Sequence, residues 1–93
     1  MVIGLLRLEL RLPDCQSLKG KRQLLLSLKT RMKNRLNVAV SEVDQQDKWQ
    51  AATLAVVSVG TDQPGVNRVL SYVSDLVEQE RSIELLDAHM EFF

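Results

Sequence analysis

Residues 2–12 read VIGLLRLELRL, and their alternation decides how the chain folds. From Leu6 onward every second residue is leucine, and the residues between are Arg7, Glu9 and Arg11. A period of two is typical of a strand with one buried and one solvated face. Pro13 and Asp14 end this strand, because both favour turns.

Working outward from this strand, apolar residues at spacings of three and four predict two helices. The first covers residues 18–35, with Ser17 as its N-terminal cap. The second begins after Asp62, which caps it, carries Pro64 in its first turn and runs to about residue 80. Residues 37–44, 51–60 and 82–93 are predicted as further strands, and the polar segment QQDKWQ at 45–50 predicts a hairpin connection.

The order β-α-β-β-α-β predicts an α+β ferredoxin-like sandwich. Right-handed crossovers then give an antiparallel sheet in the order 4-1-3-2, with both helices on one face. We expect the opposite face to be polar, with Arg7, Glu9 and Arg11 beside the acidic residues and histidine of the last strand. That set comprises Asp87, His89 and Glu91. The expected core comprises Leu6, Leu8, Leu10, Leu25, Leu28, Met32, Val69, Val73 and Leu76.

Size and composition narrow the class of protein. A chain of 93 residues allows one domain, residues 1–93. The single cysteine, Cys15, excludes an internal disulfide and fits a reducing cytosol, so a cytoplasmic protein is expected. Arg7 and Glu9 interrupt the apolar N-terminus, which excludes a signal peptide. The longest apolar stretch, at 51–60, is too short to span a membrane.

Charge is distributed very unevenly, although the net charge is zero. No acidic residue lies between Asp14 and Glu42, whereas seven of the twelve basic residues do. This basic block therefore carries +7, against −7 for the rest of the chain. Such a concentration favours an anionic partner, and RNA is the first candidate. The block comprises Lys19, Lys21, Arg22, Lys29, Arg31, Lys33 and Arg35.

Lys21 is unusual because it falls inside the leucine stripe of the predicted first helix. It must either reach solvent from the helix start or hold an anion between helix and sheet. Helix N-termini favour anions, so Lys19, Lys21 and Arg22 could form a phosphate site in which Lys21 matters most. A solvated first turn is the alternative. The distal residues Lys33 and Arg35 also complement the dipole at the helix C-terminus and need no partner.

No catalytic or cofactor motif is present, so we expect neither an enzyme nor a bound cofactor. Glu42, Asp44 and Asp47 match no metal-binding pattern, and no metal site is expected. His89 is isolated and is interpreted as a structural residue beside Glu9 or Glu91. Cys15 has no base or resolving thiol in the sequence with which to act.

Trp49 lies in the predicted hairpin and either folds onto the core or serves as an interface residue. A four-stranded sheet with an uncovered face and two free edges usually needs protection. We therefore expect a homodimer, formed through the sheet face or through the hairpin around Trp49. No membrane association is expected.

Several segments together resemble the YlxP-like family of small bacterial proteins, a domain of unknown function. They are SLKGKR at 17–22, NRLNV at 34–38, EVD at 42–44, QD at 46–47, WQ at 49–50 and LLD at 85–87. The resemblance implies a ferredoxin-like fold and, for many members, a gene neighbourhood of translation and ribosome-maturation factors. It supplies no catalytic residues. Members often have glutamate where this chain has Gly20, so the carboxylate of a capping box is missing here.

Three functional hypotheses follow. The leading one is a non-enzymatic cytoplasmic protein that binds structured RNA or a ribosomal particle through its basic first helix. The alternative is a protein-interaction or homo-oligomerisation module without a role in nucleic-acid binding. A small-ligand regulatory domain is a third, which rests on analogy with the fold alone.

Overall fold

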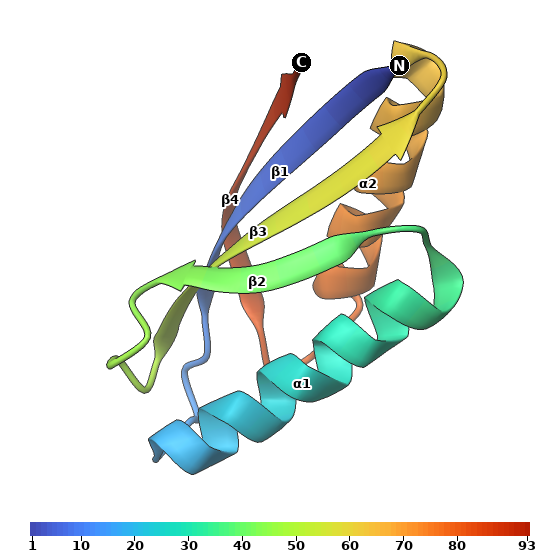
Figure 1. The fold of residues 1–93 in the computed structure, drawn as a ribbon. Helices are drawn as coiled ribbons and strands as arrows, with labels where there is room; N and C mark the ends of the chain where they lie inside the picture. Colours follow the sequence, from blue (N-terminus) through green and yellow to red (C-terminus); the bar gives the residue numbers. More distant parts are fainter.

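The computed structural model describes all 93 residues and contains four strands and two helices (Figure 1). The strands are β1 Val2–Arg11, β2 Ala39–Asp44, β3 Ala51–Gly60 and β4 Glu84–Phe92. The helices are α1 Leu18–Arg35 and α2 Gln63–Glu78. The ends agree with the predicted elements to within two residues, and β2 begins at Ala39 rather than at residue 37.

The sheet order is β2-β3-β1-β4, and every neighbouring pair is antiparallel. This confirms the predicted ferredoxin-like α+β sandwich. β1 pairs with β3 from Val2 opposite Gly60 to Arg11 opposite Ala51. Both edge strands have a register irregularity, between Glu42 and Asp44 in β2 and opposite Glu9 and Leu10 in β4. In Figure 1 both helices lie to one side of the sheet, and no element covers the other face.

Both helices begin where the predicted caps place them. The Ser17 hydroxyl accepts a hydrogen bond from the Gly20 N–H at 3.0 Å. The Asp62 carboxylate accepts one from the Gly65 N–H at 2.7 Å. Each cap satisfies a backbone donor that the helix itself leaves unpaired.

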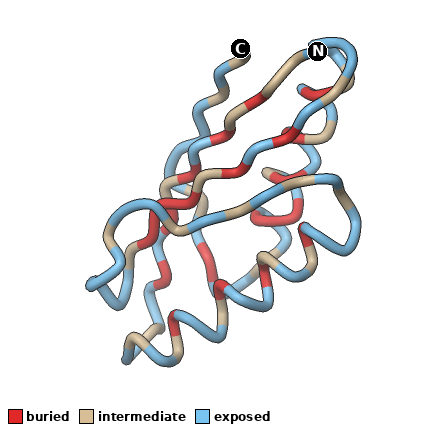
Figure 2. Tube along the Cα trace, in the orientation of Figure 1, coloured by how far each residue is buried: buried red, intermediate tan, exposed pale blue.

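The core is one cluster of sixteen buried apolar residues between the helices and one face of the sheet (Figure 2). Alternate residues of β1 and β3 supply the sheet side, as the period of two predicted. Gly4 leaves room for α2, because a Cβ there would overlap Val66 and Leu70. Of the nine predicted core residues, only Val69 is not fully buried.

The open face of the sheet is polar only at the end that contains the second half of β1 and the start of β4. Arg11 pairs there with Glu84, with nitrogen–oxygen distances of 2.8–3.1 Å, and Arg7 pairs with Glu9 at 3.0 Å. The hydrogen bond to Glu84, together with the attraction between the charges, raises the pKa of Arg11 above its usual value. His89 stands opposite Arg7 and lies 3.3 Å from Glu91, as expected.

The expectation of a polar open face is wrong at the other end of the sheet. Val57 and Val59 lie there with 38% and 50% of their surface exposed, beside Ile3 and Leu5 of β1. None of the three residues expected on β4 faces Arg11. The irregularity in β4 shifts the pairing by one residue, so Arg11 faces Glu84 rather than Leu85.

Candidate nucleic-acid interface

Lys21 is the one fully buried cation of the chain, with 1% of its surface exposed. Its Nζ donates hydrogen bonds of 2.7 Å to the carbonyl oxygens of Gln45 and Lys48. The same Nζ lies 2.7 Å from Glu42 Oε2, whose side chain is 18% exposed. Two of the three N–H donors of the ammonium group are thus used by carbonyl oxygens, and the Glu42 carboxylate lies at ion-pair distance from the same nitrogen.

The sequence required Lys21 either to reach solvent or to hold an anion between helix and sheet, and the structure has the second arrangement with an internal anion. The residue is neither solvated nor available to an external phosphate. The anion that its stripe position requires is Glu42 of the same chain, on β2. Lys21 therefore ties the start of α1 to the loop between β2 and β3, and it does not belong to a surface anion site.

A second member of the basic block is also held internally. Arg31 Nη2 lies 2.7 Å from Glu80 Oε2, which joins α1 to the segment that follows α2. Arg31 remains about one-third exposed, but its charge already has a partner. The structure thus separates the seven basic residues into two with acidic partners and five without.

Four of the five unpaired cations form a row along one side of α1. Lys19, Arg22, Lys29 and Lys33 follow one another at helical spacings, with the exposed Leu26 between them. Residues three and four apart lie on the same side of a helix. At 1.5 Å per residue, the row is about 21 Å long. We call these four side chains the basic row.

The basic row is open to solvent. Lys19, Arg22 and Lys33 are exposed and Lys29 is half-buried. No acidic group lies within 4.0 Å of any of the four. Arg35 is exposed too, but it does not belong to the basic row. It follows Arg31 by four residues and therefore lies on the same side of the helix as Arg31, away from the row. Lys33 and Arg35 occupy the last turn, where they complement the helix dipole.

Trp49 lies in the loop between β2 and β3, with 51% of its surface exposed. The loop is attached to the start of α1 by Lys21 and by Gln50, whose Nε2 donates a 3.2 Å hydrogen bond to the Cys15 carbonyl. Trp49 is therefore not folded onto the core. Its role as an interface residue stays a prediction.

The remaining candidates are dispersed. Glu42 turns toward Lys21, whereas Asp44 and Asp47 are exposed, and no three potential metal ligands lie close together. The half-buried Cys15 thiol donates to the Ser17 carbonyl at 3.3 Å.

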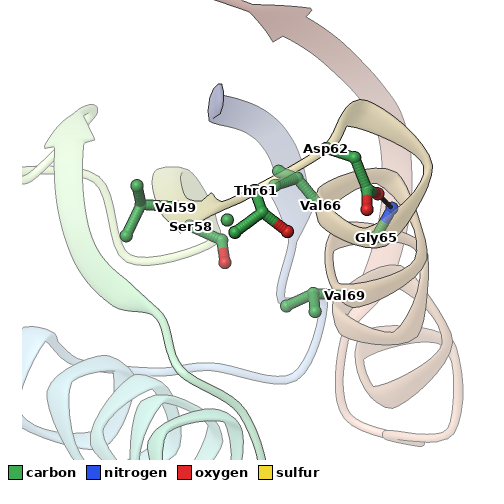
Figure 3. A pocket seen from close by; sticks show the side chains of 8 residues that line it. Ser58, Val59, Thr61, Asp62, Gly65, Val66 and Val69 are labelled. Carbon is green, nitrogen blue, oxygen red and sulfur yellow. Dashed lines mark hydrogen bonds between the residues drawn. The ribbon is translucent and has the colours of Figure 1, made fainter. Parts of the chain in front are cut away.

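Two hollows lie beside the N-termini of the helices. The one drawn in Figure 3 lies between the end of β3 and the start of α2 and measures about 180 Å³. Its only charged group, Asp62, caps Gly65, as the dashed line shows. A hollow of about 350 Å³ lies beside the start of α1 and is lined by Cys15, Ser17 and Gly20 among others. No residue of the basic block lines either hollow.

The fold and the site together define a small ferredoxin-like domain with a basic row on its first helix. No helix has the length and apolar character needed to cross a membrane. Residues 3–90 match the family described as "Protein of unknown function (DUF503)", and the chain belongs to that family. It is 34% identical over 86 residues to the "Uncharacterized protein YlxP" of Bacillus subtilis (strain 168), covering 88% of this chain and 94% of that protein.

Solved structures share the fold at low sequence identity. SnoaB, described as a cofactor-independent oxygenase from Streptomyces nogalater, is 10% identical with a TM-score of 0.53, covering 99% of this chain and 90% of its own. LarC2, the C-terminal domain of a cyclometallase, is 14% identical with a TM-score of 0.54. All of this chain aligns with LarC2, but it spans only 56% of that structure's length. Likeness at such identity concerns the fold alone.

Proposed function

We propose that this protein is a non-enzymatic, cytoplasmic RNA-binding protein that contacts the phosphate backbone of structured RNA, free or in a ribosomal particle, through the basic row. The observation that carries the proposal is the lack of acidic partners for Lys19, Arg22, Lys29 and Lys33. Arg11 on β1 and Arg31 on the same helix are, by contrast, neutralised by acidic neighbours, and the other unpaired cations do not form a row. An unpaired row can exchange its counterions for phosphates.

The predicted mode of binding is electrostatic and depends little on RNA sequence. Phosphate contacts position a protein on RNA without reading bases. The basic row contains no aromatic residue on which a base could stack, and the apolar residue that lies between its members is Leu26. Each contact with a single strand contributes roughly −0.7 to the log–log dependence of affinity on salt, so four contacts predict a slope of about −3.

A charge-matched pair of variants tests this function. The row variant carries Arg22→Gln, Lys29→Gln and Lys33→Gln. The control variant carries Lys48→Gln, Arg68→Gln and Arg81→Gln, three exposed cations elsewhere that also lack acidic partners. Both lose three positive charges, so their net charges stay equal. Binding is measured by fluorescence anisotropy with two unrelated labelled RNA hairpins and one single strand, across a salt series.

The row variant should bind all three RNAs at least about tenfold more weakly at low salt, with its slope reduced to about −1. The control variant should keep the wild-type slope. Equal binding by the row variant and the wild type would remove α1 as the RNA-binding surface. Capture from cell lysate with and without ribonuclease then shows whether the natural partner is RNA or protein.

A further inference from the structure

The apolar end of the open sheet face is a continuous surface built from neighbouring strands. Ile3 stands opposite Val59, and Leu5 stands opposite Val57. Phe93 exchanges two backbone hydrogen bonds with Ile3, at 2.8 and 3.0 Å, and is 68% exposed. We call these five residues the apolar sheet patch. Ala39, opposite Val57, extends it onto β2.

β3 has the composition of a strand that is covered on both faces. Its helix-facing residues Ala52, Leu54 and Val56 are fully buried. The outward residues at this end are also aliphatic, whereas an antiparallel strand with one solvated face normally alternates with polar residues. β1 does alternate at its far end, where Arg7 and Arg11 point outward. The apolar sheet patch therefore lacks a covering layer within the chain.

The edges of the sheet are poor sites for strand addition. Val43 interrupts the pairing of β2, and Leu86 interrupts that of β4; their side chains are 45% and 60% exposed. Irregularities of this kind disrupt the ladder that an added strand would need, and they protect edges from pairing. A partner that covers the patch must therefore pack onto the sheet face rather than extend the sheet.

We propose that a second copy of this chain covers the apolar sheet patch, giving a face-to-face dimer. A two-fold interface must be complementary to itself, and an apolar surface meets this condition. Both signs of charge border the patch: Arg7 is next along β1, and Glu91 lies beside Leu5. A mixed rim offers opposite charges to a second copy, whereas the basic row would repel its own copy.

The size of the patch sets the strength of this dimer. With about 3.3 Å per strand residue and about 4.8 Å between strands, the three residues from Ile3 to Leu5 and the four strands give a patch of roughly 10 Å by 19 Å. Two copies then bury roughly 400 Å² through the patch itself, so the charged rim must join the contact for the interface to approach the low end of specific interfaces. The expected complex is a weak, reversible dimer with a Kd in the upper micromolar range.

Sedimentation equilibrium of the full chain from about 5 to 500 µM tests the proposal, because this range spans micromolar dissociation constants. The patch variant carries Val57→Lys and Val59→Lys, at positions exposed enough to accept charge without entering the core. The control variant carries Val43→Lys and Leu86→Lys, which place the same charges at the two edges. The dimer Kd should rise at least about tenfold in the patch variant and stay within about threefold of wild type in the control.

A milder variant, Val57→Thr with Val59→Thr, keeps β-branched side chains and serves if the lysine pair impairs folding. It should also weaken the dimer, and circular dichroism establishes that each variant is folded. A wild-type chain that stays monomeric throughout the range overturns the proposal. So does a dimer that survives both patch variants but dissociates in the edge variant or in Trp49→Lys.

Discussion

At the scale of single residues, Lys21 shows how a buried charge is accommodated. Two carbonyl oxygens and one carboxylate surround its ammonium group, and all three belong to β2 or the loop after it. Removing one member of such a group leaves the others buried without a partner. The resulting loss of folding free energy is larger than the net stabilisation that the intact arrangement provides. Lys21 thus acts on stability and on the position of the loop, and the proposed contact with RNA is assigned to its neighbours.

The first residue-scale prediction is that Lys21→Met destabilises the protein by about 3 kcal/mol. For a chain of this length, that lowers Tm by more than about 10 °C. Adding Glu42→Gln should recover part of the loss, because no unpaired carboxylate then remains. Thermal unfolding followed by circular dichroism measures both effects.

Lys19→Met is the matched control, since Lys19 is an exposed lysine close to Lys21 on the same helix. It should change stability by less than about 0.5 kcal/mol while weakening RNA binding. A Lys21→Met protein as stable as the wild type would contradict the structural role of this residue.

At the scale of the element, α1 has three surfaces with different structural and proposed functional roles. Leu25, Leu28 and Met32 pack in the core, Arg31 bridges to Glu80, and the basic row faces solvent. The helix begins with a serine cap, but its first turn contains no acidic residue. Its N-terminal dipole is therefore not compensated by the chain itself.

Gly20→Glu should stabilise the protein by about 1 kcal/mol, because it replaces a weak helix former and supplies the missing capping-box carboxylate. An added Cβ would lie 3.3 Å from Ser17 Oγ, which a small shift of the hydroxyl accommodates. Chemical denaturation measures the change in unfolding free energy.

Gly20→Ala separates the helix-propensity contribution of Gly20→Glu from that of the capping-box carboxylate, since alanine improves helix propensity without adding charge. The carboxylate stabilises the fold only when ionised. Glu and Ala variants should therefore differ near neutral pH and converge as pH falls and the carboxylate becomes protonated. A Gly20→Glu protein less stable than wild type would show that the first turn cannot accept a side chain.

At the scale of the whole molecule, the proposed surfaces lie on different parts of the fold. The basic row is on a helix, and the apolar sheet patch is on the sheet face that no helix covers (Figure 1). RNA binding and self-association should therefore respond to different substitutions. The loop that carries Trp49 precedes β3, whereas Val57 and Val59 lie near the end of that strand, some 20–25 Å along it at about 3.3 Å per residue.

Trp49 is the only tryptophan of the chain and so reports on its own surroundings. If dimerisation uses the sheet face, quenching of its fluorescence by acrylamide should be the same in dilute and concentrated samples. The patch variant should give the same quenching constant as the wild type. Protection of Trp49 that increases with concentration would instead place the interface at the loop.

Much of the fold could be predicted because its signals are local. The alternation in residues 2–12, the caps Ser17 and Asp62, and the apolar stripes depend on neighbours a few residues apart, and the structure confirms them. The basic block was also visible in the sequence, because it is contiguous. The sequence did not show which cations are free, since the acidic partners of Lys21 and Arg31 lie 21 and 49 residues away.

The sequence by itself determined the elements, their order and the amphipathic faces, because periodicity and capping act over one or two turns. Only the tertiary structure decided the two surfaces proposed here. Ion pairing across elements reduced seven cations to a row of four with Arg35 apart. Strand register brought Ile3, Val59 and Phe93 together from both ends and the middle of the chain. Register is set by packing of distant segments, so no local pattern could report it.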